Sequence, residues 1–94
     1  MSKKPLCIAF LWHMHQPDYH HPQTGEIVLP WTRFHAIKDY YDMAELVCQI
    51  PGIHVTINVV PSLIDQLTEY ATGRAHETYA ALTLRDASQL SDQE

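Results

Sequence analysis

Runs of apolar residues, separated by polar segments that contain proline and glycine, divide the chain into predicted strands and helices. The first run is unbroken from Leu6 to Trp12, which is typical of a strand covered on both faces in a parallel sheet. We predict a strand over residues 6–13. A second run, rich in β-branched residues and closed by Pro61, predicts another strand over residues 54–60.

Between these strands, apolar residues recur at helical spacing. They predict a helix that is capped by Thr32 and ends before the next Pro-Gly pair. The apolar stripe of this helix consists of Phe34, Ile37, Tyr41, Ala44 and Cys48. Two pairs at i, i+4 spacing, Lys38 with Asp42 and His35 with Asp39, are expected on its solvent side.

Two further helices are predicted after the second strand. One begins at a Ser62–Asp65 capping box and ends at Gly73, and a weaker pattern predicts another over residues 76–84. The succession of strand, helix, strand and helix is a βαβ unit followed by its next helix. This order of elements defines an α/β fold class.

The number of predicted strands is small for an independent sheet. Two parallel strands that are buried on both faces do not make a stable sheet alone. The spacing of Ser91 and Glu94 is that of a helix start, yet the sequence ends where the body of that helix should begin. We therefore expect residues 1–94 to be the amino-terminal fragment of a larger α/β domain.

Charge and composition narrow the classes of partner. The chain has 94 residues and a net charge of −5, and its six Lys and Arg residues do not cluster, which argues against a nucleic-acid partner. No apolar stretch is long enough to cross a membrane. Lys3 and Lys4 precede an apolar run without a signal-peptide cleavage site, so we expect a cytoplasmic protein with Cys7 and Cys48 as free, buried thiols.

A group of polar side chains follows the first predicted strand. His13 and His15 are two residues apart, so in an extended chain their side chains leave the same face. Gln16 offers both a hydrogen-bond donor and an acceptor, which suits a pattern of hydroxyl groups. Because chemistry in parallel α/β folds collects at the carboxyl ends of strands, these residues are candidates for binding a ligand.

Two other interpretations of the histidines stay open. A His-x-His pair on a strand can chelate zinc, but a zinc site needs three or four ligands and no firm spacing supplies a third. The imidazoles can also be structural, with loop carbonyls as partners.

Trp31 and Asn58 are the remaining candidates for ligand binding. Trp31 precedes the predicted first helix and is either a stacking platform for a sugar ring or a packing anchor. Asn58 is polar in an otherwise apolar strand and therefore needs a partner, which is either the loop after the first strand or a ligand. The acidic residues lie on predicted helix faces or turns, and no pair converges at the strand ends, so a two-carboxylate hydrolase site cannot be assembled from this chain.

Three segments, taken in order, resemble a known family. They are His13–Tyr19 (HMHQPDY), Leu29–Met43 (LPWTRFHAIKDYYDM) and Asn58–Ile64 (NVVPSLI). The first is similar to the conserved His-Gln-Pro region of the family-57 glycoside hydrolases. The second resembles the segment that enters the first helix of that family, and the third resembles the exit of its second strand.

The resemblance implies the β-α-β-α opening of an incomplete (β/α)7 barrel that acts on α-glucans with retention of configuration. Related activities include α-amylases, 4-α-glucanotransferases, branching enzymes and amylopullulanases. The nucleophile (a Glu) and the acid/base (an Asp) come from later regions of the family, so no catalytic residue is assigned here and the chain alone is expected to be inactive.

The resemblance also implies which partners the chain meets. His15 is expected to contact the sugar next to the cleaved bond, with His13 and Gln16 in the same motif. The expected partners are an α-glucan and the remainder of the chain's own polypeptide, with no cofactor and no metal. Two alternatives remain: a metal-dependent barrel hydrolase of the deacetylase type that uses His13 and His15, and a non-catalytic carbohydrate-binding module.

Overall fold

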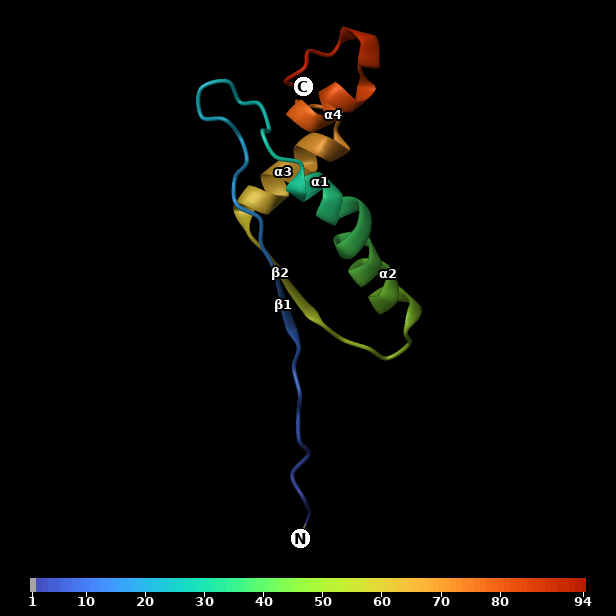
Figure 1. Cartoon of the computed structure of the whole chain (residues 1–94). Helices are drawn as coiled ribbons and strands as arrows, with labels where there is room; N and C mark the ends of the chain where they lie inside the picture. Colours follow the sequence, from blue (N-terminus) through green and yellow to red (C-terminus); the bar gives the residue numbers. More distant parts are fainter. Residues whose placement is uncertain (1) are drawn as a thin grey trace.

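The computed structural model describes residues 2–94, which form an elongated α/β arrangement (Figure 1). Its elements are β1 (Leu11–Met14), α1 (Trp31–His35), the π-helical turn η1 (Ala36–Tyr40), α2 (Tyr41–Gln49), β2 (Thr56–Val59), α3 (Pro61–Ala71), α4 (Thr78–Leu84) and the 3-10 turn η2 (Ala87–Gln89). The chain extends over 76 × 28 × 24 Å, because its amino-terminal segment projects away from the helices. No helix within residues 2–94 is long and apolar enough to span a membrane.

The two strands pair in parallel, as predicted. The register places Leu11 opposite Thr56 and Met14 opposite Val59. The first strand is shorter than expected, and the prediction that it is covered on both faces is wrong for the described residues. Leu6 is 88% exposed and Phe10 is 61% exposed, because they lie in the segment before β1, which no third strand or helix among residues 2–94 covers.

A single helical stretch from α1 through η1 to α2 occupies the predicted position of the first helix. The prediction that Thr32 caps it is wrong, because Pro30 holds the cap position and the buried Thr32 hydroxyl donates to Gln66 Oε1 at 3.2 Å. The predicted apolar stripe is exposed, and the main packing of this helical stretch on another helix is that of α1 against α3. The Lys38–Asp42 and His35–Asp39 pairs are confirmed.

Helices α3 and α4 lie close to their predicted positions, but their starts differ. Pro61 is the first residue of α3, and the predicted capping box is wrong because the Ser62 hydroxyl donates to the Gln16 carbonyl at 2.7 Å. Gly73 follows the helix with a φ of +71°, a conformation that glycine adopts at little cost. The carboxylate of Glu77 caps α4 by accepting from the Ala80 amide at 3.0 Å.

The tightly packed part of the molecule is small. Among residues 2–94, the largest completely buried side chains are those of Ile27, Leu63, Gln66 and Thr32. Ile27 brings the long loop between β1 and α1 onto the segment before α4, since its amide donates to His76 O and its carbonyl accepts from Thr78 N. The radius of gyration is 19.1 Å, whereas a compact domain of this length has about 12 Å. Most apolar side chains of the strands and of α2 therefore remain accessible.

Both cysteines are free, as expected, but the prediction that they are buried is wrong. Cys7 lies in the extended segment before β1, and Cys48 lies on α2. Both thiols are exposed because neither segment is covered by another element of residues 2–94.

Candidate functional site

The carboxyl ends of β1 and β2 bring three candidate residues together. The parallel register places His13 opposite Asn58, and His13 Nδ1 lies 2.5 Å from Asn58 Oδ1. The rings of His13 and His15 leave the same face, as predicted, with centroids 6.0 Å apart and planes inclined by 29°. Because an amide oxygen only accepts hydrogen bonds, His13 Nδ1 donates, which leaves Nε2 of a neutral ring as an acceptor.

Gln16 is held between the loop and the π-helical turn. The Tyr19 hydroxyl donates to Gln16 Oε1 at 2.7 Å, and Gln16 Nε2 donates to the Tyr40 hydroxyl at 3.2 Å. The amide keeps a second N–H and a second lone pair for a ligand. Tyr40 is the last residue of η1, and such turns recur at functional sites in proteins. These contacts fix the orientation of the Gln16 amide, which directly follows His15 in the chain.

The backbone after His15 is anchored on α3. The Ser62 hydroxyl donates to Gln16 O, and Gln66 Nε2 donates to Pro17 O at 2.8 Å. The sequence analysis did not identify Gln66. A feature of the sequence that could have indicated it is its position: Gln66 is polar but lies three residues after Leu63, on the apolar side of the predicted helix.

Trp31 lies in a different part of the molecule from the histidines. It begins α1 and is 46% exposed, with its ring edge-to-face against Phe34 at a centroid distance of 6.0 Å. The two rings line an open groove of about 530 Å³ together with Tyr79 of α4. The lining of this groove includes none of the strand-end residues His13, His15 and Asn58.

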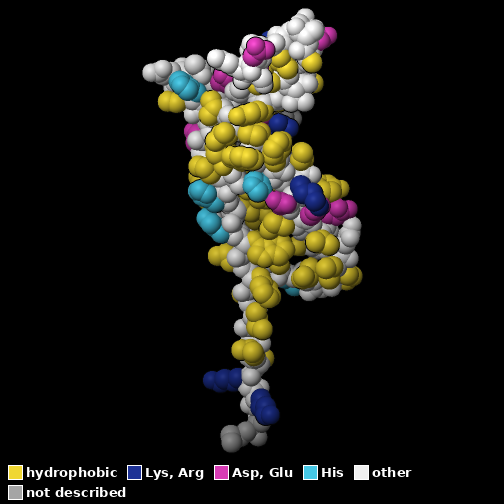
Figure 2. Space-filling view, in the orientation of Figure 1, with side chains coloured by type: hydrophobic (Ala, Val, Ile, Leu, Met, Phe, Trp, Pro, Cys, Tyr) yellow, Lys and Arg dark blue, Asp and Glu magenta, His cyan; other side chains and the backbone are white. Residues whose placement is uncertain are grey.

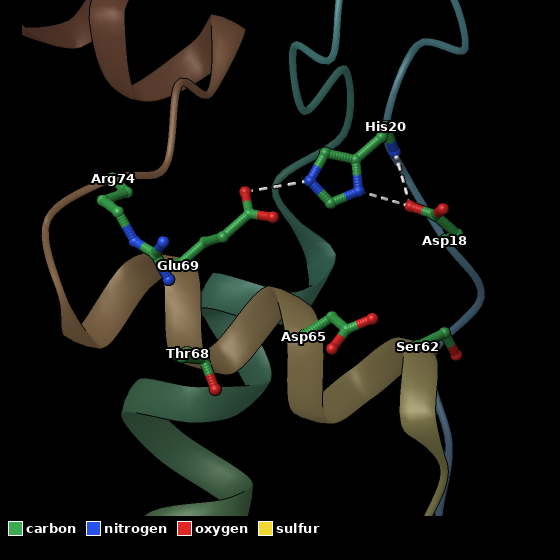
Figure 3. A pocket seen from close by; sticks show the side chains of 7 residues that line it. All are labelled: Asp18, His20, Ser62, Asp65, Thr68, Glu69 and Arg74. Atoms are coloured by element: carbon green, nitrogen blue, oxygen red, sulfur yellow. Dashed lines mark hydrogen bonds and ion pairs between the residues drawn. The ribbon is translucent and has the colours of Figure 1, made fainter.

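A second cavity, polar and about 230 Å³ in volume, lies between the loop and α3 (Figure 3). It is lined by Asp18, His20, Ser62, Asp65, Thr68, Glu69 and Arg74. The His20 ring bridges two carboxylates, with Nδ1 2.5 Å from Asp18 Oδ1 and Nε2 2.9 Å from Glu69 Oε2. Because both ring nitrogens face acceptors, the imidazolium form fits this position best.

The carboxylates around His20 shift its titration. Its hydrogen bond to Glu69, joined by that to Asp18, raises the pKa of His20 against the opposing effect of burial. Hydrogen bonds from the His20 amide and ring hold the pKa of Asp18 below its usual value. The lowered pKa of Asp18 and the raised pKa of His20 together bound the pH range in which both groups of the bridge are charged.

We expect a pH window in the stability that this bridge contributes. A raised pKa for His20 means that its contribution is full below the unfolded value of about 6.5 and is lost as the pH rises through the folded value. A lowered pKa for Asp18 means that its contribution is full above about pH 4 and is lost as the pH falls through the folded value. Urea unfolding of wild type and His20→Gln should therefore differ most between these limits, and a constant difference from pH 4 to 9 would contradict the bridge.

The described residues do not assemble a metal centre. Among residues 2–94 there is no group of three or more His, Cys, Asp or Glu side chains placed to hold a metal ion. His13 and His15 lie side by side, but His13 is engaged with Asn58. The third ligand that the zinc interpretation requires is thus not found within this range.

The comparisons with known proteins identify the class of this α/β chain. The family model described as glycosyl hydrolase family 57 matches residues 9–93, so the chain belongs to this family. Searches against curated proteins and against solved structures gave no match. The match includes both strands and all the helices, and the family resemblance of the sequence is thereby confirmed.

Family membership places the chain among enzymes that hydrolyse or transfer glycosidic bonds. Its substrate class is accordingly carbohydrate. Pyranose rings present hydroxyl groups around an apolar face, and proteins bind them with planar polar side chains and aromatic rings. Both kinds of group are exposed here, the imidazoles at the strand end and Trp31 at the start of α1.

Proposed function

We propose that the chain forms the opening part of a (β/α)7 barrel in a retaining enzyme that acts on α-glucans. The observation that carries this proposal is the cluster of His13, His15 and Asn58 at the carboxyl ends of two parallel strands, within the family match. Active sites of parallel barrels are built at that end of the strands. The free thiols fit the cytoplasmic location that we propose for the enzyme.

The exposed apolar surface supports the barrel. Hydrophobic side chains line the extended amino-terminal segment and continue over the neighbouring elements (Figure 2). Leu6, Ile8 and Phe10 are all more than half exposed in an extended segment. In a closed parallel barrel such side chains pack against further strands and an outer ring of helices. We propose that the remainder of the same polypeptide supplies these elements.

Each strand-end residue has a proposed part in substrate binding. His15, whose ring lies exposed beside that of His13, contacts the sugar next to the cleaved bond. His13 presents Nε2 to a sugar hydroxyl, and Asn58 fixes its ring through Nδ1. Gln16 uses its second N–H and lone pair on a neighbouring hydroxyl.

Trp31 is proposed to bind a sugar ring farther along the glucan. Its exposed indole lines the groove beside Phe34 and Tyr79, and aromatic faces of this kind stack on the apolar face of a pyranose. A stacked ring at this position extends the binding surface beyond the strand end.

The chemical step itself needs groups that this chain does not supply. Retaining glycosidases use two carboxyl groups about 5–5.5 Å apart, one as nucleophile and one as acid/base. In the proposed enzyme these are a Glu and an Asp from later parts of the polypeptide. The residues described here bind and orient the substrate, and the interactions that tighten at the transition state accelerate the reaction.

Turnover of maltooligosaccharides by the full-length polypeptide that contains these residues tests the proposal. We expect the first product to keep the α configuration, as followed by proton NMR, and activity to survive treatment with a chelator. The 94-residue chain alone is the control and should show no turnover. Lack of activity on every α-glucan in the full-length polypeptide would contradict the proposal.

The same assay separates the two other candidate functions. Loss of activity with removal of stoichiometric zinc, and its return with added zinc, favours a metal-dependent hydrolase that uses His13 and His15. A 94-residue chain that unfolds cooperatively and binds maltooligosaccharide without turnover favours a carbohydrate-binding module.

A further inference from the structure

We propose that Gln66, on α3, is a positioning residue for the strand-end site: its buried amide fixes the backbone that follows His15 and thereby orients Gln16. The inference rests on the proposed function, since it assigns a role in substrate binding at the same site. Gln66 does not itself reach the strand end. It acts through Pro17 and Tyr19, which lie in the loop after β1.

The amide of Gln66 is completely buried and uses all of its hydrogen-bonding capacity. Its Nε2 donates to the carbonyls of Pro17 at 2.8 Å and of Ser62 at 3.0 Å. Its Oε1 accepts from the Tyr19 amide at 3.4 Å and from the Thr32 hydroxyl at 3.2 Å. Two carbonyls face the nitrogen and two donors face the oxygen, so the orientation of the amide is unambiguous.

These four contacts join three parts of the fold at one point. Tyr19 and Pro17 belong to the loop after β1, Thr32 belongs to α1, and Gln66 itself belongs to α3. A completely buried amide with every partner in place is rigid, because rotating it would leave several buried polar groups without partners. The loop after the strand end is therefore clamped to both helices.

The hydrogen bonds of Gln66 to the loop, called the clamp below, influence the position of Gln16 through two sets of contacts. Through the Tyr19 amide the clamp places the Tyr19 side chain, whose hydroxyl donates to Gln16 Oε1 at 2.7 Å. Through the Pro17 carbonyl it holds the residue next to Gln16, whose own carbonyl is bound by Ser62. Gln16 directly follows His15, so both sets of contacts converge on the sugar-binding side chains.

An amide is the side chain that this position requires. Leucine has a similar volume but leaves the Pro17 carbonyl, the Tyr19 amide and the Thr32 hydroxyl without their partner. A carboxylate at this position only accepts hydrogen bonds, so the Pro17 carbonyl loses its donor. A protonated carboxyl group restores one donor. The effect of Gln66→Glu should therefore depend on pH.

Kinetics of the full-length enzyme test the role. We expect Gln66→Leu to lower kcat/KM on maltooligosaccharides by on the order of 10- to 100-fold, as misplacement of binding groups does. Leu63→Ala is the matched control, because it removes buried volume from the same helix without touching the Gln66 contacts. It should lower the thermal midpoint but leave kcat/KM of the folded enzyme within about twofold. Equal kcat/KM losses in the two variants would overturn the proposal.

The pH profile of Gln66→Glu distinguishes a positioning role from a merely structural one, because a purely structural role would not change the pH dependence of kcat/KM. Its kcat/KM should approach that of wild type at the acidic end of the pH profile and fall with an additional titration as the introduced carboxyl group ionises. This variant also serves if Gln66→Leu does not fold. A pH profile parallel to that of wild type would count against the positioning role.

NMR of side-chain amides separates failure of this inference from failure of the proposed function. In protein labelled with 15N-glutamine, the Gln16 amide should shift or broaden in Gln66→Leu, or in Gln66→Glu at neutral pH, and stay unchanged in Leu63→Ala. If wild type turns over no α-glucan, the proposed function fails and this comparison alone decides the positioning role. An unchanged Gln16 resonance in both Gln66 variants overturns it.

Discussion

Replacing His15 with alanine is expected to lower kcat/KM of the full-length enzyme on maltooligosaccharides by about 10²-fold, the usual cost of losing a polar contact that strengthens in the transition state. We expect this effect because the His15 imidazole is exposed beside that of His13 at the carboxyl end of β1, where the substrate is proposed to bind. A contact made only in the transition state lowers kcat, whereas one made equally with bound substrate raises KM. Steady-state kinetics with a defined maltooligosaccharide separate these two effects.

His54→Ala is the matched control for His15→Ala. His54 is also an exposed histidine, but it precedes β2 and therefore lies at the opposite end of the two strands. Its replacement should leave kcat/KM near that of wild type. If both variants behave alike, or if His15→Ala keeps normal kinetics, His15 does not belong to the substrate-binding site.

Glu77→Leu is expected to lower the free energy of unfolding by about 3 kcal/mol. Breaking a buried ion pair usually costs about 3–5 kcal/mol, and we take the lower end because Arg33 keeps some access to solvent. The Glu77 side chain is 1% exposed and that of Arg33 is 29% exposed. Arg33 donates to both Glu77 oxygens, at 2.6 and 2.9 Å, and the Tyr70 hydroxyl donates at 2.9 Å.

The titration of Glu77 reflects the same contacts. Burial alone raises the pKa of Glu77, but hydrogen bonds from Arg33 and Tyr70 outweigh it, so the pKa lies below its usual value. The contribution of Glu77 to stability is therefore present above the unfolded pKa of about 4.3 and is lost as the pH falls through the folded value.

Urea unfolding at neutral pH measures the effect of Glu77→Leu. Lys38→Ala is the control, because it removes an exposed ion pair within one helix, the pair with Asp42. Exposed pairs of this kind contribute little to stability, so this variant should unfold close to wild type. Similar unfolding midpoints for Glu77→Leu and Lys38→Ala would show that the buried network does not stabilise the fold.

Local patterns in the sequence predicted the parts of the structure that depend on local geometry. The apolar runs identified both strands, and helical spacing identified the stretch from α1 to α2 as well as α3 and α4. The two-residue periodicity of a strand placed His13 and His15 on one face. These features follow from repeats of two and 3.6 residues, which a single sequence displays.

Contacts between distant segments were beyond these patterns. Ser62 was expected to cap its own helix, but the Gln16 carbonyl, 46 residues earlier, takes its hydroxyl. Thr32 was expected to cap α1, but it donates to Gln66, 34 residues later. Glu77 was expected, with the other acidic residues, on a helix face or a turn, whereas it caps α4 and pairs with Arg33 from α1. No local repeat encodes which distant group a polar side chain will meet.

The clamp on the loop after β1 also sets an order of events during synthesis. Tyr19 and Pro17 are held by a side chain that lies 47 and 49 residues farther along the chain. Contacts of such long sequence separation form late, because the entropy of closing the intervening chain must first be overcome. During translation, the loop after β1 is therefore synthesised before α3 exists to hold it. The backbone that follows the strand-end histidines takes its final position only after translation has passed Gln66.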